Sequence, residues 1–279
     1  MLFLKSLMYS SIITASLAAA LTAYAFLAIK SPIDYSILII NFIGTFVGYN
    51  LISLITLLSQ KHLSKNHHSK ETQTDFMQWF IIHKYKIIYS LFIVIPVILF
   101  YAISLKKILL FNFVHLFIII LIYERGLFQR FKLFFNFREI TYLKPLVISY
   151  TWTMACVCSP MLEYGFINWN LLISTFLSIY ALCLMYDLRD IDTDNTEGLV
   201  TIAHKLKINH FKFLIWSFYI ASLLFRNTFI PITEKTSLYF FEVLLVSLLI
   251  YKARPNQDDY LYILVSDGLM AFKLLYVLG

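Results

Sequence analysis

The chain has 279 residues, of which 60% are hydrophobic and only 14% are charged, and its mean hydropathy is +0.75. Soluble globular domains carry about 25% charged residues, so this composition excludes that class and predicts an all-α, polytopic transmembrane helical bundle. The net charge of +7 could suggest a nucleic-acid partner. The basic residues lie in loops between apolar segments, however, so we expect a lipid bilayer and no nucleic acid.

Nine apolar segments predict about nine membrane spans in a single transmembrane domain, residues 1–279. They are 7–29, 35–58, 87–105, 108–123, 145–162, 168–186, 211–230, 236–252 and 259–278. Several of them are shorter than the ~20 residues that a span needs. The expected cytoplasmic loops are 59–86, 124–144 and 187–210.

The first segment has two interpretations. Lys5, an apolar run and the small-residue sequence Ala23-Tyr24-Ala25 are similar to a cleaved signal peptide. The run from Leu7 to Ile29 covers 23 residues, which is long for a signal peptide and suits a span. We therefore expect a membrane span, and cleavage would leave the topology of the rest unchanged.

Lysine and arginine residues concentrate in alternate loops. With a cytoplasmic N-terminus, 17 of the 23 basic residues lie on the cytoplasmic side, as the positive-inside rule requires. This predicts a multi-pass protein, in the inner membrane if it is bacterial. The end of the second segment, the start of the fifth and the end of the sixth then face the cytoplasm together.

The end of the sixth segment is unusually acidic. Five carboxylates lie within eleven residues there: Asp187, Asp190, Asp192, Asp194 and Glu197. If the helix continues to Asp194, then Asp187, Asp190 and Asp194 share one face. Proteins commonly hold Mg²⁺ with a few carboxylates and substrate phosphates, so these three are candidate metal ligands. The alternative is a solvated loop whose acidic residues mark a helix end.

The stretch from Tyr186 to Ala203, YDLRDIDTDNTEGLVTIA, resembles the second acidic motif of the UbiA-type membrane prenyltransferase superfamily. That motif typically reads D-x-R-D-x-x-x-D, followed by Gly and Thr, at the cytoplasmic end of the sixth of nine helices. The matching residues, in order and spacing, are Asp187, Arg189, Asp190, Asp194, Gly198 and Thr201. Position 200 is Val, where the family often has a basic residue. A second stretch, REITYLKPLVISYTW, is similar to the basic entry into the family's fifth helix through Arg138, Lys144 and Trp152.

The resemblance implies transfer of a prenyl group from a polyprenyl diphosphate to a hydrophobic acceptor, either aromatic or lipid. Mg²⁺ would neutralise the diphosphate, and basic and amide side chains would bind it. Aromatic rings around the cavity would tolerate the allylic cation. The residues implied are Asp187, Asp190 and Asp194 as catalytic residues and metal ligands, with Asn50, Arg138, Lys144 and Arg189 at the diphosphate.

The family's first acidic motif is missing from this chain. Its usual form is N-D-x-x-D or N-x-x-x-D-x-x-x-D, and the matching stretch is YNLISLITLLSQ. Asn50 remains, but Leu51, Leu54 and Leu58 stand where carboxylates are expected, and an amide supplies no charge. The alternative function is therefore a catalytically inactive or altered UbiA-fold protein that binds an isoprenoid, a quinone or a partner.

Glu242 and Asp267 lie inside apolar segments, where ionisable groups are costly and suggest function. A transporter could use them, although no inverted repeat is visible. The simpler interpretation pairs each with a base or hydroxyl on a neighbouring helix, and Lys273 is one such base.

The remaining histidines and cysteines suit structural roles better than metal sites. His62, His67 and His68 lie in a basic stretch that a solvated loop explains. His115 is expected to pack in the core and bond a neighbouring helix. The three cysteines lie in apolar runs without the spacing of a metal site; they are Cys156, Cys158 and Cys183.

Overall fold

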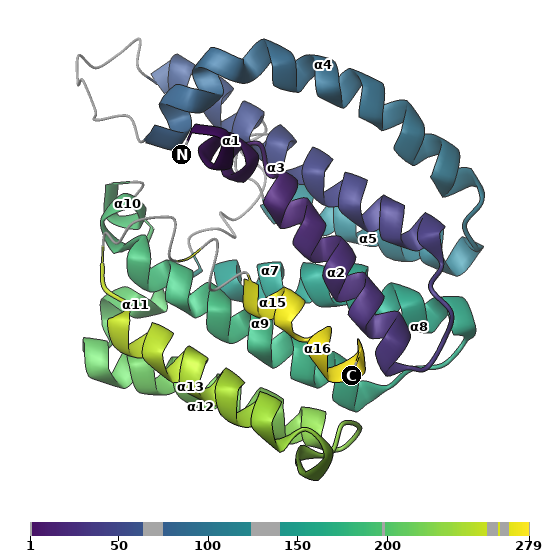
Figure 1. The fold of residues 1–279 in the computed structure, drawn as a ribbon. Helices are drawn as coiled ribbons and strands as arrows, with labels where there is room; N and C mark the ends of the chain where they lie inside the picture. The colour runs from purple at the N-terminus through teal and green to yellow at the C-terminus, as the bar shows by residue number, and fades with distance from the viewer. Residues whose placement is uncertain are drawn as a thin grey trace.

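The computed structural model describes residues 2–63, 75–123, 140–196, 199–255, 262 and 268–278 (Figure 1). The secondary structure in these ranges is helical throughout, with no strand, which confirms the all-α prediction. The N-terminal half contains α1 Leu2–Tyr9, α2 Ile12–Ala28, α3 Tyr35–Leu63, α4 Asp75–Ile103 and α5 Lys107–Tyr123. The rest contains α7 Leu143–Thr153, a π-helical turn Met154–Cys158, α8 Ser159–Tyr164, α9 Trp169–Arg189, α10 Ile191–Thr196, α11 Ile202–Lys205, α12 Ile208–Asn227, a 3₁₀ turn Ile232–Glu234, α13 Thr236–Lys252, α15 Gly268–Phe272 and α16 Leu275–Leu278.

Five helical segments in the described ranges are long and apolar enough to cross a membrane: Tyr35–Ile55, Gln78–Ile103, Leu143–Tyr164, Trp169–Arg189 and Ile208–Asn227. The count of about nine spans is therefore not confirmed. The helices α2 and α5 have 17 residues each, or about 26 Å at 1.5 Å per residue, against a hydrocarbon core of about 30 Å. The expected ninth segment, 259–278, lies partly outside the described residues.

Two predicted boundaries are wrong. The first segment is not one helix, because the chain breaks between α1 and α2 at Ser11, whose φ of 63° is left-handed. The described residues of the expected loop 59–86 are helical, because α3 continues to Leu63 and α4 already begins at Asp75. Hydropathy locates the lipid-embedded part of a helix, and both helices extend beyond that part.

The helix α9 lies at the centre of the bundle, packed against α7 and α12 (Figure 1). On the other side, α2 packs against α3, α15 and α16. One large apolar core joins α2, α7, α9, α12, α13, α15 and α16. The whole arrangement places the C-terminal end of α9 beside the start of α7 and of α11.

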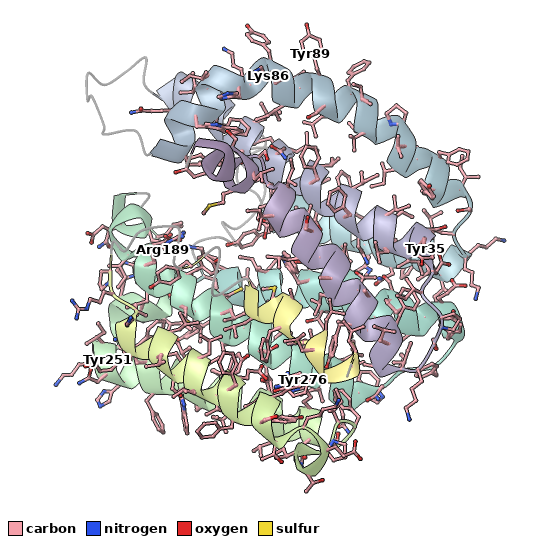
Figure 2. The ribbon with its side chains drawn as sticks, in the orientation of Figure 1. Tyr35, Lys86, Tyr89, Arg189, Tyr251 and Tyr276 are labelled. Carbon is pink, nitrogen blue, oxygen red and sulfur yellow. The ribbon has the colours of Figure 1, made fainter. Side chains whose placement is uncertain are left out.

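The outermost helix, α4, arches over α3 (Figure 1) and contains Pro96, a residue that bends helices. Its outer surface is apolar and exposed, as at Phe92 and Phe100. Figure 2 shows Lys86 and Tyr89 pointing outward from its first half. An exposed apolar face of this kind suits contact with lipid.

The fifth predicted span contains a π-helical turn ahead of Pro160. In a π-helix, each backbone N–H bonds the carbonyl five residues earlier. Pro160 has no N–H, so the Ala155 carbonyl receives no bond of this kind. The Asn41 side chain of α3 donates to this carbonyl instead, at 2.9 Å. Asn112 of α5 likewise donates to the Met154 carbonyl at 3.0 Å. Two amides from neighbouring helices thus complete the backbone hydrogen bonding of the irregular turn.

Candidate functional site

The candidate site lies at the C-terminal end of α9. The helix starts at a cap in which the Asn168 side chain accepts from the Leu171 N–H at 3.1 Å. It ends at Arg189, and Asp190 leads into α10. Helical hydrogen bonding continues across the junction, because the Asp194 N–H donates to the Asp190 carbonyl at 2.7 Å. Asp187 and Asp194 therefore stay on one side of the chain.

Lys144, in the first turn of α7, lies between these two carboxylates. Its Nζ is 3.1 Å from both Oδ1 and Oδ2 of Asp194 and 3.3 Å from Oδ1 of Asp187. The side chains of Asp187 and Asp194 are only 1% and 5% exposed, whereas that of Lys144 is 21% exposed. The base from the fifth segment and the acids from the sixth thus form one ionic cluster, which we call the Lys144 cluster.

One carboxylate oxygen of the Lys144 cluster is unused. Asp187 Oδ2 is buried and accepts no hydrogen bond from the described residues. A buried acceptor without a donor is costly, by about 1–3 kcal/mol. The cluster also carries two carboxylates against one ammonium group. Both features favour a ligand that donates a hydrogen bond over one that brings further negative charge.

Asp190 and Arg189 form a separate pair beside the cluster. Arg189 Nε lies 2.6 Å from Asp190 Oδ1. The Arg189 guanidinium also lies over the Tyr186 ring, 4.9 Å from its centroid, and 5.4 Å from the centroid of Tyr262. Ring faces attract a guanidinium at such distances. This arrangement ties Arg189 and Asp190 to each other and to aromatic neighbours.

Asn50 has a structural environment in α3. Its Nδ2 donates to the Ser10 carbonyl at 3.1 Å and to the Phe46 carbonyl at 2.8 Å. The first bond satisfies a backbone carbonyl at the break between α1 and α2. Both amide hydrogens are thereby used, and Asn50 Oδ1 is a buried acceptor without a partner. The predicted contact between Asn50 and a diphosphate stays a prediction.

Several predicted residues lie outside the described part of the chain. They are Arg138, Glu197, Gly198, Asp267, His67 and His68, together with the side chain of His62. Among the described ones, His115 Nε2 lies 3.1 Å from the Tyr150 hydroxyl of α7. The contact with a neighbouring helix is as expected, but His115 is only half-buried and does not belong to the core.

Thr201, which matches the family motif, caps the short helix α11. Its backbone N–H donates to His204 Nδ1 at 3.1 Å, so the ring must carry its proton on Nε2. That nitrogen lies 3.1 Å from the Ile191 carbonyl of α10 and donates to it. His204, which sequence reasoning missed, thus holds α10 and α11 together next to the Lys144 cluster. The capping pattern T-x-x-H was the available signal.

The predicted magnesium ligands do not fit a metal ion in the arrangement described here. Lys144 Nζ occupies the space between Asp187 and Asp194 that a cation would take, and Asp190 is paired with Arg189. Within the described ranges, no three His, Cys, Asp or Glu side chains form a group that could hold a metal ion. A metal would require Lys144 to leave the cluster.

A second buried ionic cluster lies toward the other end of α12. The Glu242 carboxylate accepts from Arg226 Nη2, from the Tyr276 hydroxyl, and from the Tyr219 hydroxyl at 2.6 Å. The guanidinium of Arg226 lies over the rings of Tyr239 and Tyr276, at 4.9 Å and 4.2 Å. The base beside Glu242 is therefore Arg226. Lys273, one possible partner considered from the sequence, is buried and donates to Ser178 Oγ.

The chain matches no protein-family model, and no curated protein or solved structure matches it.

Proposed function

We propose that this chain is a UbiA-type membrane protein that binds the hydroxyl-bearing head of an isoprenoid or quinol without transferring it. The observation that carries this proposal is the position of Lys144 Nζ, 3.1 to 3.3 Å from the carboxylate oxygens of Asp194 and Asp187. The chain's own ammonium group takes the position of a cation between the carboxylates. The tail of such a ligand needs only apolar helix surfaces.

The charge of the Lys144 cluster argues for a neutral head. Two carboxylates oppose one ammonium group, so a diphosphate would meet a net negative site unless another cation joined it. A hydroxyl can instead donate to Asp187 Oδ2, the buried oxygen without a partner. Isoprenoid alcohols and quinols bring such a donor on an apolar tail.

The setting that we propose is a multi-pass protein of about nine spans, with a cytoplasmic N-terminus and the Lys144 cluster on the cytoplasmic face. The excess of Lys and Arg in alternate loops supports this orientation. Five described helical segments are long and apolar enough to serve as membrane spans. The helix α13 and the shorter apolar helices α2, α5 and Gly268–Leu278 would complete the bundle by packing against these.

A second candidate is the prenyltransferase that the resemblance implies, with a polyprenyl diphosphate, a hydrophobic acceptor and Mg²⁺ at Asp187, Asp190 and Asp194. It is favoured by the convergence of Lys144 with two residues of the acidic motif. In this case Lys144 would leave the carboxylates and turn to the diphosphate, where an ammonium group binds well. The missing carboxylates at Leu54 and Leu58 weigh against it.

The two candidates differ in ligand and in metal dependence. We would measure the thermal stability of the purified protein in detergent with farnesol, and diphosphate release from farnesyl diphosphate with and without Mg²⁺. We expect farnesol to raise the melting temperature, and Asp187→Asn to weaken its binding at least about tenfold, or 1.4 kcal/mol. The matched control is Asp192→Asn, which changes an exposed acid of the same stretch.

Magnesium-dependent release of diphosphate that is lost in Asp187→Asn but kept in Asp192→Asn would overturn the binding proposal and establish the second candidate. Stabilisation by farnesol that is unchanged in Asp187→Asn would place the ligand elsewhere and remove the Lys144 cluster from the proposal.

A further inference from the structure

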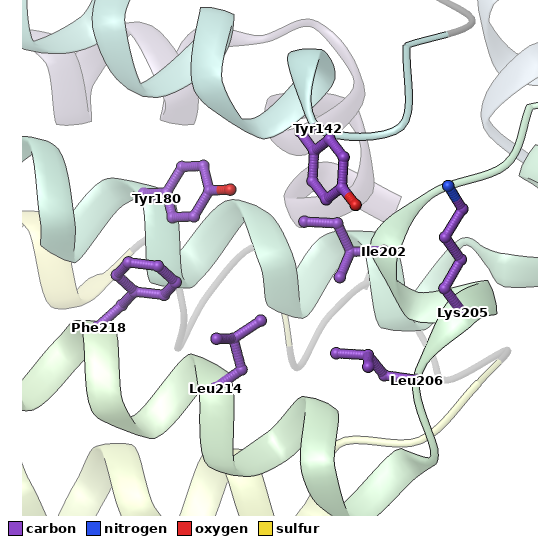
Figure 3. A pocket seen from close by; sticks show the side chains of 7 residues that line it. All are labelled: Tyr142, Tyr180, Ile202, Lys205, Leu206, Leu214 and Phe218. Carbon is purple, nitrogen blue, oxygen red and sulfur yellow. The ribbon is translucent and has the colours of Figure 1, made fainter.

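A cavity of about 300 Å³ lies on the side of α9 that faces α11 and α12 (Figure 3). Its aromatic walls are Tyr142, Tyr180 and Phe218. Three aliphatic side chains complete the apolar lining: Ile202, Leu206 and Leu214. None of the residues of the Lys144 cluster lines this cavity, although Tyr142 lies only two residues before Lys144.

The cavity runs along the helices from their ends toward the middle of the bundle. Lys205 precedes α12, which begins at Ile208, whereas Phe218 lies ten residues into that helix. At 1.5 Å per residue, Phe218 is about 15 Å along the axis. That distance is half of a hydrocarbon core of about 30 Å. With α12 as a membrane span that begins at the level of the lipid headgroups, the lining extends from that level to the level of the acyl chains.

Among the described residues, Lys205 is the one charged side chain that lines the cavity, and it is exposed at the outer end. Its Nζ is 5.7 Å from the centroid of the Tyr142 ring. Figure 3 shows Lys205 at one end of the lining and Phe218 at the other. The site thus has one cationic end and an otherwise apolar or aromatic wall.

We propose that this cavity holds one acyl chain of an anionic phospholipid whose phosphate pairs with Lys205. The volume lies at the small end of ligand sites, about 300–1,000 Å³, as a single chain requires. Two of the lining side chains, Tyr142 and Leu206, are themselves exposed on the surface of the bundle, so the bilayer itself can supply the ligand. This lipid site goes beyond the proposed function and does not depend on it.

The test is native mass spectrometry of the full-length protein, purified in detergent and mixed with phosphatidylglycerol or phosphatidylcholine. We expect the wild type to retain several-fold more phosphatidylglycerol. Lys205→Ala should remove that preference, and Leu206→Trp should lower retention of both lipids by filling the cavity. The matched control is Lys207→Ala, because Lys207 is also exposed but does not line the cavity. Melting temperatures establish that each variant folds.

Three results would overturn the proposal. Equal loss of phosphatidylglycerol in Lys205→Ala and Lys207→Ala would indicate general attraction to a basic surface. Unchanged retention in Leu206→Trp would show that no chain enters the cavity. Displacement of the lipid by inorganic phosphate alone would indicate a site for free phosphate.

Discussion

Glu242 shows how a buried charge is tolerated in this bundle. Its side chain is fully buried, and so is its partner Arg226. Two tyrosine hydroxyls complete the hydrogen bonding of the carboxylate, those of Tyr219 and Tyr276. A buried ion in an apolar surrounding is stable only when it is paired and hydrogen-bonded. The contacts around Glu242 meet that condition, which favours a structural role over the transporter interpretation.

We expect Glu242→Gln to destabilise the protein strongly. The substitution leaves the Arg226 guanidinium buried without a counter-charge, and loss of one partner of a buried pair costs about 3–5 kcal/mol. Thermal unfolding in detergent, followed by tryptophan fluorescence, measures this loss. The control is Glu234→Gln, which changes an exposed carboxylate in the turn before α13. Equal melting temperatures for the two variants would show that the ion pair adds nothing to stability.

The pairing of Glu242 with Arg226 joins two helices that follow one another in the chain. Arg226 lies one residue before the end of α12, whereas Glu242 lies six residues after the start of α13. The two positions are not symmetric about the turn, so the pairing depends on the reach of the arginine side chain and on helix packing that hydropathy does not predict. Lys273 was one possible partner for Glu242 or Asp267 because it lies in an apolar segment, a criterion that carries no geometric constraint. It bonds Ser178 of α9 instead.

At the scale of helices, composition predicted some elements closely and others poorly. The segment 236–252 coincides with α13, and 168–186 differs from α9 by three residues at one end. These helices are apolar along most of their length. The segment 87–105 missed the first part of α4, because Lys84 and Lys86 lower the hydropathy without ending the helix. The π-helical turn could not be predicted, since it changes the hydrogen bonding and leaves the apolar pattern intact.

That turn depends on amides from two other helices, so its loss should be measurable. Asn112→Leu removes the donor that bonds the Met154 carbonyl and Ser159 Oγ, each at 3.0 Å. We expect the free energy of unfolding to fall by about 1–2 kcal/mol, the contribution of a buried hydrogen bond. Denaturant or thermal unfolding measures it, with the exposed Asn209→Leu as the control. Unchanged stability would mean that the turn forms without Asn112.

At the scale of the whole molecule, the two ionic clusters lie toward opposite ends of the bundle. Asp187 lies near the C-terminal end of α9, whereas Arg226 lies near the C-terminal end of the next long helix, α12, which follows after a short connection. The sequence indicated that acids and bases meet at the first end. It could not indicate that Lys144 would lie between Asp187 and Asp194, because this depends on the packing of α7 against α9.

The orientation of the bundle can be tested on α12 alone. This helix has 20 residues and is about 30 Å long, enough to cross the hydrocarbon core. Lys207 precedes it, and Lys235 follows the turn at its other end. With a cytoplasmic N-terminus, Lys207 faces the cytoplasm and Lys235 faces outward.

We would therefore label Lys207→Cys and Lys235→Cys in intact cells with a membrane-impermeant maleimide. The native cysteines are buried and free, so they should contribute little background, and the unsubstituted chain serves as the control. We expect Lys235→Cys to react in intact cells and Lys207→Cys only after permeabilisation. The reverse pattern would invert the topology and place the Lys144 cluster outside, where no cytoplasmic ligand reaches it. Labelling of both sites from one side would mean that α12 does not span the membrane.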